Sequence, residues 1–214
     1  MPKTRHRPQS ARPKKGARPK TEGQVRIIAG HWRGRRLKFP LVADLRPTGD
    51  RIRETLFNWL QPTLAGANCL DLFAGSGALG FEAASRGANH VTLIEAQSDA
   101  AAALRNNLQA LTATDSNDPD SPADINIVHG EALNWLTQHH DTQTFDIVFL
   151  DPPFSMDGID QLASTLESAR LLAKECWIYF ESGTQGARPR LPTNWSCHRE
   201  KIAGGVCYQL YRRS

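Results

Sequence analysis

Short runs of apolar residues recur along the chain from residue 68 onward, and stretches with helical periodicity separate them. The apolar runs have the usual length of a buried strand, and the intervening stretches are long enough to form helices. We predict strands at 68–73, 90–95, 125–129, 145–150 and 176–181. We predict helices at 77–86, 98–111, 131–139 and 159–170, the second capped by Ser98 or Asp99.

This alternation of strands and helices predicts an α/β fold built on a doubly wound, mostly parallel sheet. Two further strand-like stretches, at 195–199 and 205–212, flank a turn that contains Gly204-Gly205. They would add an antiparallel ribbon to the sheet. The expected architecture is therefore a seven-stranded, Rossmann-like sheet.

A small β-hairpin and helix are expected to precede the sheet. Residues 25–30 and 36–40 read as two strands on either side of a turn at 31–34. The residues around Thr48 and Asp50 then open a helix that runs through Leu60, and either residue could be its N-cap. The buried face of this helix is predicted to contain Ile52, Leu56, Trp59 and Leu60, with Arg51, Glu54 and Asn58 on another face.

Charge divides the chain more sharply than hydrophobicity does. Residues 1–53 contain 16 Lys and Arg against three acids, a net charge of +13, and the other 161 residues contain 10 against 19, a net charge of −9. Clustered basic residues gain affinity for nucleic acid by releasing phosphate counterions, so a polyanionic partner is favoured over a merely solvated tail. Residues 1–22 are expected to form a disordered basic tail, because they contain hardly any apolar side chain. We place a hairpin-and-helix segment at 23–62 and a main domain at 63–214.

Cysteine usage and hydropathy point to a cytoplasmic protein. The four cysteines show no close pairing, and Cys69 and Cys176 lie inside predicted strands, where a reduced, buried thiol is expected. No stretch is apolar enough to span a bilayer, and the basic N-terminus lacks the apolar region of a secretory signal.

The first candidate site is the glycine loop after the strand at 68–73. Gly75 and Gly77 begin a G-x-G-x-x-G pattern that enters a helix, which alone is compatible with either a dinucleotide or S-adenosylmethionine. Asp71 favours S-adenosylmethionine, because a carboxylate repels a pyrophosphate but attracts an ammonium group. The neighbouring Phe73 belongs to the same candidate site.

Two further acids end the next predicted strands. Glu95 is placed to accept hydrogen bonds from ribose hydroxyls, a feature that both cofactor classes share. Glu131, followed by Ala132, is placed to accept from an adenine amine. One such acid is often only a helix cap, but three at successive strand ends indicate a binding site.

The second candidate site is the loop Asp151-Pro152-Pro153-Phe154, which follows the strand at 145–150. Two prolines fix the backbone and remove two N–H donors. The Asp151 side chain and the Pro152 carbonyl could then accept both hydrogens of a nucleobase amine and direct its lone pair at a methyl group. Phe154 could stack on the base, at about 1–3 kcal/mol, although a strand-ending turn with a buried phenylalanine is the alternative.

The tip of the predicted hairpin combines Trp32 with basic residues. It could stack on a base and grip phosphates, or Trp32 could simply close the hairpin. The candidate nucleic-acid-binding residues here and in the following segment are Arg33, Arg35, Arg36, Lys38, Arg46 and Arg51.

Together these motifs resemble the class I S-adenosylmethionine-dependent methyltransferases, and the segments 25–37 and 46–60 are similar to the RsmD family. That resemblance covers about residues 25–210 and implies methylation of the N2 amine of one guanine in 16S ribosomal RNA, within the assembling small subunit. It implies that Asp71, Gly75, Gly77, Glu95 and Glu131 line the cofactor site and that 151–154 hold the guanine. Glu131 stands where the family pattern leads us to expect Asp. A monomer that needs no metal is expected.

Three other functions fit parts of the sequence. An adenine-N6 methyltransferase acting on DNA would share both motifs. A dinucleotide oxidoreductase would explain the glycines but would leave Asp71 and the loop 151–154 without a role. A non-catalytic factor that binds ribosomal RNA during assembly would explain the basic arm alone.

Overall fold

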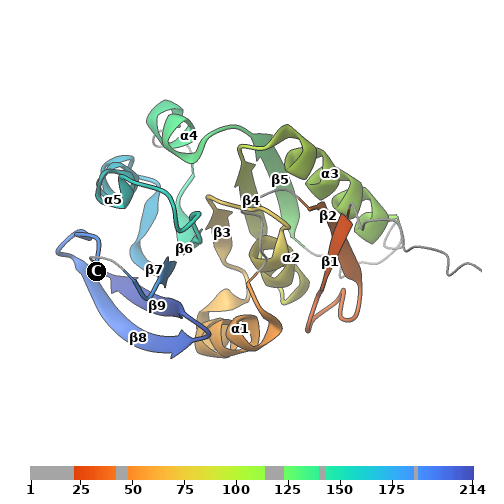
Figure 1. Ribbon diagram of the computed structural model, residues 1–214, viewed down its shortest axis with the longest axis horizontal. Helices are drawn as coiled ribbons and strands as arrows, with labels where there is room; N and C mark the ends of the chain where they lie inside the picture. The colour runs from red at the N-terminus through yellow and green to blue at the C-terminus, as the bar shows by residue number, and fades with distance from the viewer. Residues whose placement is uncertain (1–21, 42–47, 114–122, 140–142, 186–187) are drawn as a thin grey trace, which may run out of the picture.

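The computed structural model describes residues 22–41, 48–113, 123–139, 143–185 and 188–214. Its centre is a seven-stranded sheet with the strand order β5-β4-β3-β6-β7-β9-β8 (Figure 1). The strands are β3 (Asn68–Asp71), β4 (His90–Glu95), β5 (Asp124–His129), β6 (Phe145–Leu150), β7 (Leu172–Gly183), β8 (Trp195–Ala203) and β9 (Val206–Arg213). The predicted architecture is confirmed.

Strands β3 to β7 are parallel, and β9 joins antiparallel to both β7 and β8. The central strand β3 pairs with β4 on one side and with β6 on the other, so the chain reverses its direction of winding there. In open α/β sheets, ligands bind outside the carboxyl ends of the strands at this point of reversal. The topology therefore indicates where a site should lie.

Five helices cover the two faces of the sheet: α1 (Asp50–Leu64), α2 (Ala78–Ser85), α3 (Ser98–Thr112), α4 (Ala132–Gln138) and α5 (Ile159–Ser168). One apolar cluster joins α1, α2, α3 and the N-terminal hairpin to the sheet. A second cluster joins α4 and α5 to the opposite face (Figure 1). Strand β6 lies between them and is apolar on both faces, with Ile147, Val148 and Phe149 fully buried, as expected of a central parallel strand.

The N-terminal hairpin consists of β1 (Glu22–Arg26) and β2 (Arg36–Pro40), paired antiparallel. Its alternate side chains Val25, Leu37 and Phe39 are buried and belong to the same core cluster as the sheet. Asn107 on α3 fixes the hairpin further, because it exchanges hydrogen bonds of 3.0 and 2.8 Å with the backbone of Lys38. The predicted hairpin and its second strand are confirmed, but the first strand ends at Arg26, whereas it was predicted at 25–30.

The predicted helix caps are wrong. Gly49 is the N-cap of α1 and Gln97 that of α3, and neither cap position has a side-chain hydrogen bond. The Thr48 hydroxyl instead donates to Asp151 across the sheet edge, 2.9 Å away. The position of Thr48 beside a helix start predicts a local hydrogen bond, whereas its actual partner, Asp151, lies far along the chain.

The buried residues of helix α1 also include some that lie outside the predicted buried face. Leu56 and Leu60 are buried as predicted, but Phe57 and Arg53 are buried as well, while Ile52 and Trp59 are only half-buried. Arg51, Glu54 and Asn58 are exposed, as expected. A periodicity argument does not anticipate a buried arginine, which requires partners from other elements.

Cys69 and Cys176 are buried and free, as expected, and burial raises the pKa of both thiols. In the part of the chain that the structure describes, no helix has the length and apolarity needed to cross a membrane. Residues 1–21 of the expected tail, Arg46, and most of the polar loop at 115–124 lie outside the described residues.

Candidate active site at the carboxyl edge of the sheet

Four acids converge at the carboxyl ends of the strands: Asp71, Glu95, Asp151 and Glu181. Burial raises the pKa of Asp71 to about 7, hydrogen bonds from the backbone of Phe73 and Gly80 lower it, and the charge of Glu95 raises it. Asp151 feels the charges of both Glu181 and Asp71. The first and second candidate sites therefore lie at the same edge of the sheet, close enough for their acids to interact electrostatically.

Glu95 holds the glycine loop in place. Its carboxylate is 8% exposed and accepts hydrogen bonds from the backbone N–H of Gly75 and of Gln97, each 2.7 Å long. These bonds tie the end of β4 to the turn after β3. Glu95 therefore shapes the loop in addition to its predicted role toward ribose hydroxyls.

Gly77 and Gly80 are required by packing. Gly77 has a left-handed backbone (φ 76°), and a Cβ there would lie 2.5 Å from a ring carbon of Phe81 and 2.6 Å from Leu104. A Cβ on Gly80 would lie 2.2 Å from Leu93. The glycines let α2 start tightly against the sheet, a packing requirement that the G-x-G-x-x-G pattern alone does not reveal.

Glu131 and Ala132 lie at the start of α4, next to Glu95. Glu131 is the N-cap residue but its exposed side chain makes no capping hydrogen bond. The N–H of Gly130 donates to the Glu95 carbonyl at 2.9 Å, which places this turn beside the end of β4. The Glu131 carboxylate is therefore exposed and does not cap the helix.

The loop at 151–154 presents an acceptor and an aromatic ring. The Asp151 carboxylate accepts from Thr48, and its pKa is raised well above the ordinary value by burial and by the charge of Glu181. Pro152 is buried, and the N–H of Met156 donates to the Pro153 carbonyl at 2.8 Å, which closes the turn. Phe154 is 60% exposed, which contradicts the alternative of a buried phenylalanine.

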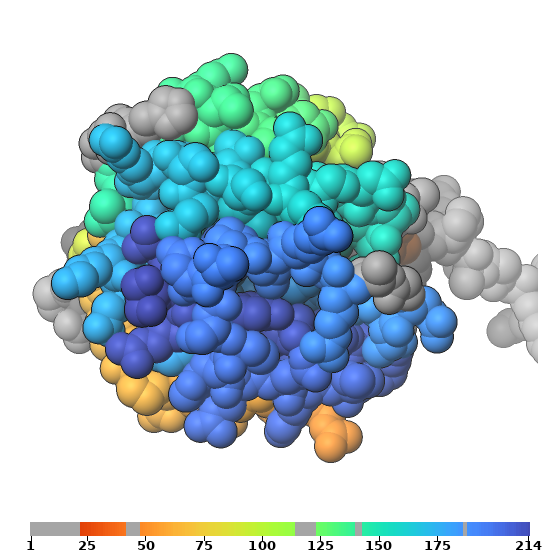
Figure 2. All heavy atoms as spheres, turned by 90° about the vertical axis from the view of Figure 1, so that its left-hand side faces the viewer, coloured from red at the N-terminus to blue at the C-terminus, as the bar shows by residue number. Residues whose placement is uncertain are grey.

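A pocket of about 740 Å³ opens beside this loop, between the residues after β6 and the C-terminal strands. Its lining includes Pro152, Pro153, Phe154, Arg188, Gln209 and Tyr211. Figure 2 faces the side of the molecule where the blue strands β8 and β9 border the teal segment that follows β6. Asp71, Gly75, Glu95 and Asp151 do not line the pocket, so it adjoins the loop at Pro152, Pro153 and Phe154 and not the glycine loop.

The predicted RNA-binding residues separate into two groups. Arg33, Arg36, Lys38 and Arg51 are exposed. Arg35 is half-buried and donates to the Ala110 carbonyl at the end of α3, 2.7 Å away, which indicates a structural role.

Trp32 does not present its ring to a ligand. It is 2% exposed and its ring contacts Phe81 edge-to-face, while its backbone N–H donates to the Ser85 hydroxyl at 2.9 Å. The structure therefore contradicts stacking on a base and supports the alternative, in which Trp32 closes the hairpin.

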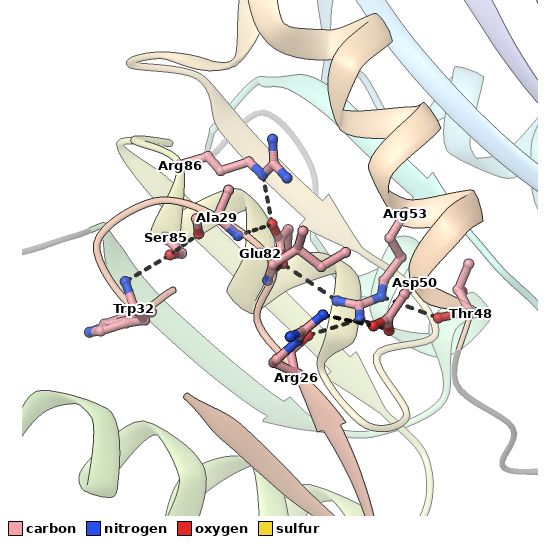
Figure 3. Close-up of polar contacts among 10 residues, drawn as sticks. Arg26, Ala29, Trp32, Thr48, Asp50, Arg53, Glu82, Ser85 and Arg86 are labelled. Carbon is pink, nitrogen blue, oxygen red and sulfur yellow. Dashed lines mark hydrogen bonds and ion pairs between the residues drawn. The ribbon is translucent and has the colours of Figure 1, made fainter. Parts of the chain in front are cut away.

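A buried ion-pair network connects the hairpin to the edge of the site (Figure 3). The Glu82 carboxylate accepts from the N–H groups of Ile28 and Ala29, from Arg86, and from Arg53 at 3.4 Å. Arg53 in turn donates from Nε to the Thr48 carbonyl at 3.2 Å. Thr48 is thereby anchored by its backbone while its hydroxyl reaches Asp151.

Thr48, Tyr179 and Glu181 are site residues that sequence analysis missed. The Tyr179 hydroxyl donates to Glu181 at 2.5 Å on the same face of β7. A signal for Glu181 was present, because it is an acid at the end of an apolar strand, as Asp71 and Glu95 are. Nothing local distinguished Thr48 from a helix cap.

The described residues of the loop 151–154 provide hydrogen-bond acceptors where a substrate would react. Asp151 and the adjoining proline carbonyl suit a group that carries two N–H bonds, and exposed Phe154 suits a planar ring. The glycine loop with Asp71, Glu95 and Glu131 suits a ligand that carries an ammonium group, ribose hydroxyls and an amine. A pyrophosphate would meet the negative charge of Asp71 and Glu95.

Comparisons with known proteins show the family of the chain and relatives with the same fold. The family described as Conserved hypothetical protein 95 matches residues 25–212. Ribosomal RNA small subunit methyltransferase D of Escherichia coli (strain K12) is 47% identical over 191 residues, which are 89% of this chain and 91% of that protein. The protein of the same name from Haemophilus influenzae is 44% identical over 200 residues, covering 93% and 99%. The solved structure of yhhF from Escherichia coli has a TM-score of 0.77 and 46% identity, covering 90% of this chain and 99% of that one.

Proposed function

Because the chain belongs to the Conserved hypothetical protein 95 family, which is the RsmD family of methyltransferases, we propose that it methylates small-subunit ribosomal RNA with S-adenosylmethionine. Within that activity, we propose the N2 amine of a guanine in 16S ribosomal RNA as the acceptor. The protein acts as a monomer on the assembling small subunit.

The observation that carries the proposal is that one loop presents both the Asp151 carboxylate and an exposed Phe154. A phenylalanine exposed by 60% at the rim of a pocket has little packing reason to be there, whereas a base stacked on it would cover it. Asp151 lies three residues before it and supplies the acceptor for the amine.

The target base leaves its stack and enters the slot beside Phe154. Asp151 and the Pro152 carbonyl accept the two amine hydrogens and direct the nitrogen lone pair. S-adenosylmethionine supplies a methyl group on a sulfonium sulfur. With that group bound, the nitrogen lone pair would form the new N–C bond, the electrons of the broken C–S bond would pass to sulfur, and Asp151 would accept the proton that the nitrogen releases. Positioning of this kind accounts for most of the rate.

The residues at the glycine loop fit such a cofactor. Asp71 is 1% exposed with its pKa raised to about 7, so a cationic amino group nearby would lower that pKa and favour the carboxylate. Glu95 retains acceptor capacity beyond its two backbone bonds, and Glu131 is exposed beside it.

Cofactor affinity is expected to rise with pH between about 6 and 7.5, because binding requires Asp71 to lose its proton. Calorimetry in buffers of different ionisation enthalpy should show proton release on binding. In Asp71→Asn the affinity should fall by about tenfold and lose this pH dependence. An unchanged pH dependence in the variant would remove Asp71 from the cofactor site.

RNA binding is expected to depend on the exposed residues of the hairpin. Replacing Arg33, Arg36 and Lys38 by alanine should weaken RNA binding and flatten its dependence on log[salt] by about 0.7–0.9 per lost phosphate contact. Arg199→Ala, an exposed arginine on β8, is the matched control and should leave the slope unchanged. A slope that stays unchanged in the triple variant would place the interface elsewhere.

Transfer of labelled methyl groups tests the proposal against its alternatives. The protein should label unmodified small-subunit ribosomal RNA but not plasmid DNA, which separates it from an adenine-N6 DNA methyltransferase. Calorimetry should show binding of S-adenosylmethionine and not of NAD, which separates it from an oxidoreductase. A protein that binds ribosomal RNA but transfers no methyl group would be an assembly factor.

A further inference from the structure

The carboxylate of Asp151 has a hydrogen-bond partner on one of its two oxygens. The Thr48 hydroxyl donates to Oδ2 over 2.9 Å, and among the residues that the structure describes no other group donates a hydrogen bond to this side chain. An ionised carboxylate can accept several hydrogen bonds, so Oδ1 keeps its capacity to accept from a substrate. The contact with Thr48 therefore restricts how the carboxylate can turn and leaves one oxygen available.

Thr48 is itself held by residues outside the loop that it bonds. It is 7% exposed, and its carbonyl accepts a hydrogen bond of 3.2 Å from Nε of Arg53. The fully buried Arg53 guanidinium also donates to the Arg26 carbonyl at 2.8 Å and to the Asp50 carboxylate at 2.7 Å (Figure 3). Glu82 accepts from its Nη1 at 3.4 Å. Because the planar guanidinium is bonded on several sides, it gives Thr48 a fixed anchor.

The titratable groups around Asp151 oppose its ionisation. Glu181 and Tyr179 face it from β7, and Asp71 faces it from β3. Burial raises the pKa of Asp151, and the charge of Glu181 raises it further. The hydrogen bond from Thr48 lowers this pKa, and the charge of Asp71 adds a smaller increase. Among these described neighbours, Thr48 is thus the group that stabilises the ionised form of Asp151.

We propose that Thr48 is a positioning residue, whose hydroxyl holds Oδ2 of an ionised Asp151 so that Oδ1 accepts a hydrogen of the target amine. The inference rests on the proposed function. Thr48 keeps its own hydrogen throughout, while the proton that the amine releases binds to Asp151 and passes to solvent when the product departs. Because Arg53 anchors Thr48, the buried network that holds the N-terminal hairpin also orients the reacting carboxylate.

The pH dependence of single-turnover methyl transfer, with saturating S-adenosylmethionine and RNA, tests this role. Thr48→Val keeps the shape of the side chain but removes the hydroxyl, so ionised Asp151 loses a charge-assisted hydrogen bond and its pKa should rise. Since the reaction requires ionised Asp151, the acid limb should move to higher pH by about one unit, and the plateau rate should fall by about tenfold. Thr48→Ser retains the hydroxyl and should retain the acid limb of the unaltered protein.

Thr55→Val is the matched control on helix α1. The Thr55 hydroxyl donates to the Arg51 carbonyl at 3.0 Å, so the same substitution removes a bond within the helix. Its plateau rate and acid limb should coincide with those of the unaltered protein. Thr48→Ala also lacks the hydroxyl but has no added methyl group, so it should show the same shift as Thr48→Val even if valine disturbs folding.

A double-mutant cycle separates positioning from a general structural role. In the Asp151→Ala background, Thr48→Val should change the rate by less than about twofold, because the group that Thr48 holds is absent. An equal loss in both backgrounds would overturn the inference and leave the proposed function intact. So would acid limbs of Thr48→Val and Thr48→Ala that coincide with that of the unaltered protein. Failure of the unaltered protein to methylate RNA would instead overturn the proposed function.

Discussion

Replacing Asp151 by alanine is expected to lower the single-turnover rate of methyl transfer by about 10²- to 10³-fold, which is the usual cost of removing one preorganised hydrogen-bonding group from a reacting centre. In the proposed reaction Asp151 both orients the target amine and accepts its proton, so the variant loses both contributions. Affinity for S-adenosylmethionine should change by less than about threefold, because Asp71, Glu95 and Glu131 remain. Stopped-flow or quench measurements with saturating cofactor and RNA give the rate directly.

Two comparisons sharpen this prediction. Asp151→Asn should fall between the alanine variant and the unaltered protein, because its amide oxygen still accepts a hydrogen from the amine but cannot take up a proton. Asp99→Ala removes an exposed carboxylate on α3 and should leave the rate unchanged. Full activity in Asp151→Ala would exclude Asp151 from the reaction.

Replacing Glu82 by alanine is expected to lower the free energy of unfolding by about 3–5 kcal/mol. Both side chains of the Glu82–Arg53 pair are fully buried, so removal of the carboxylate leaves the charge of Arg53 in the core without this partner. Two backbone N–H groups, those of Ile28 and Ala29, lose their acceptor as well. Urea unfolding followed by circular dichroism measures the loss.

Glu54→Ala, an exposed acid on α1, serves as the control and should change the free energy of unfolding by less than about 0.5 kcal/mol. The double variant Arg53→Met/Glu82→Leu should lose less than Glu82→Ala alone, since it leaves no unpaired buried charge. A loss below about 1 kcal/mol in Glu82→Ala would show that the pair does not hold the hairpin to the sheet.

The strand and helix pattern predicted the architecture because burial on both faces of a parallel sheet leaves uninterrupted apolar runs, as in β4 and β6. The loop at 151–154 was predictable for a related reason: two prolines after an acid restrict the backbone wherever the fold places them. From the sequence, Phe154 could either stack on a base or be buried in a strand-ending turn, and its exposure decides between these two interpretations.

The residues that escaped prediction have partners far along the chain. Thr48 and Asp151 are 103 residues apart, and Arg53 and Glu82 are 29 apart. The neighbouring sequence predicts Thr48 as a helix cap, and it gives no reason for a buried arginine on α1. Trp32 lies among basic residues in the sequence, which is typical of a nucleic-acid contact. The packing of Phe81 against its ring shows instead that it belongs to the core.

Identification of the methylated nucleoside tests the central claim most directly. Small subunits that lack the modification are incubated with this protein and S-adenosylmethionine, and their ribosomal RNA is digested to nucleosides and analysed by mass spectrometry. The account predicts N2-methylguanosine, at one site, that does not form with Asp151→Ala. Formation of N6-methyladenosine, or of no methylated nucleoside, would contradict it.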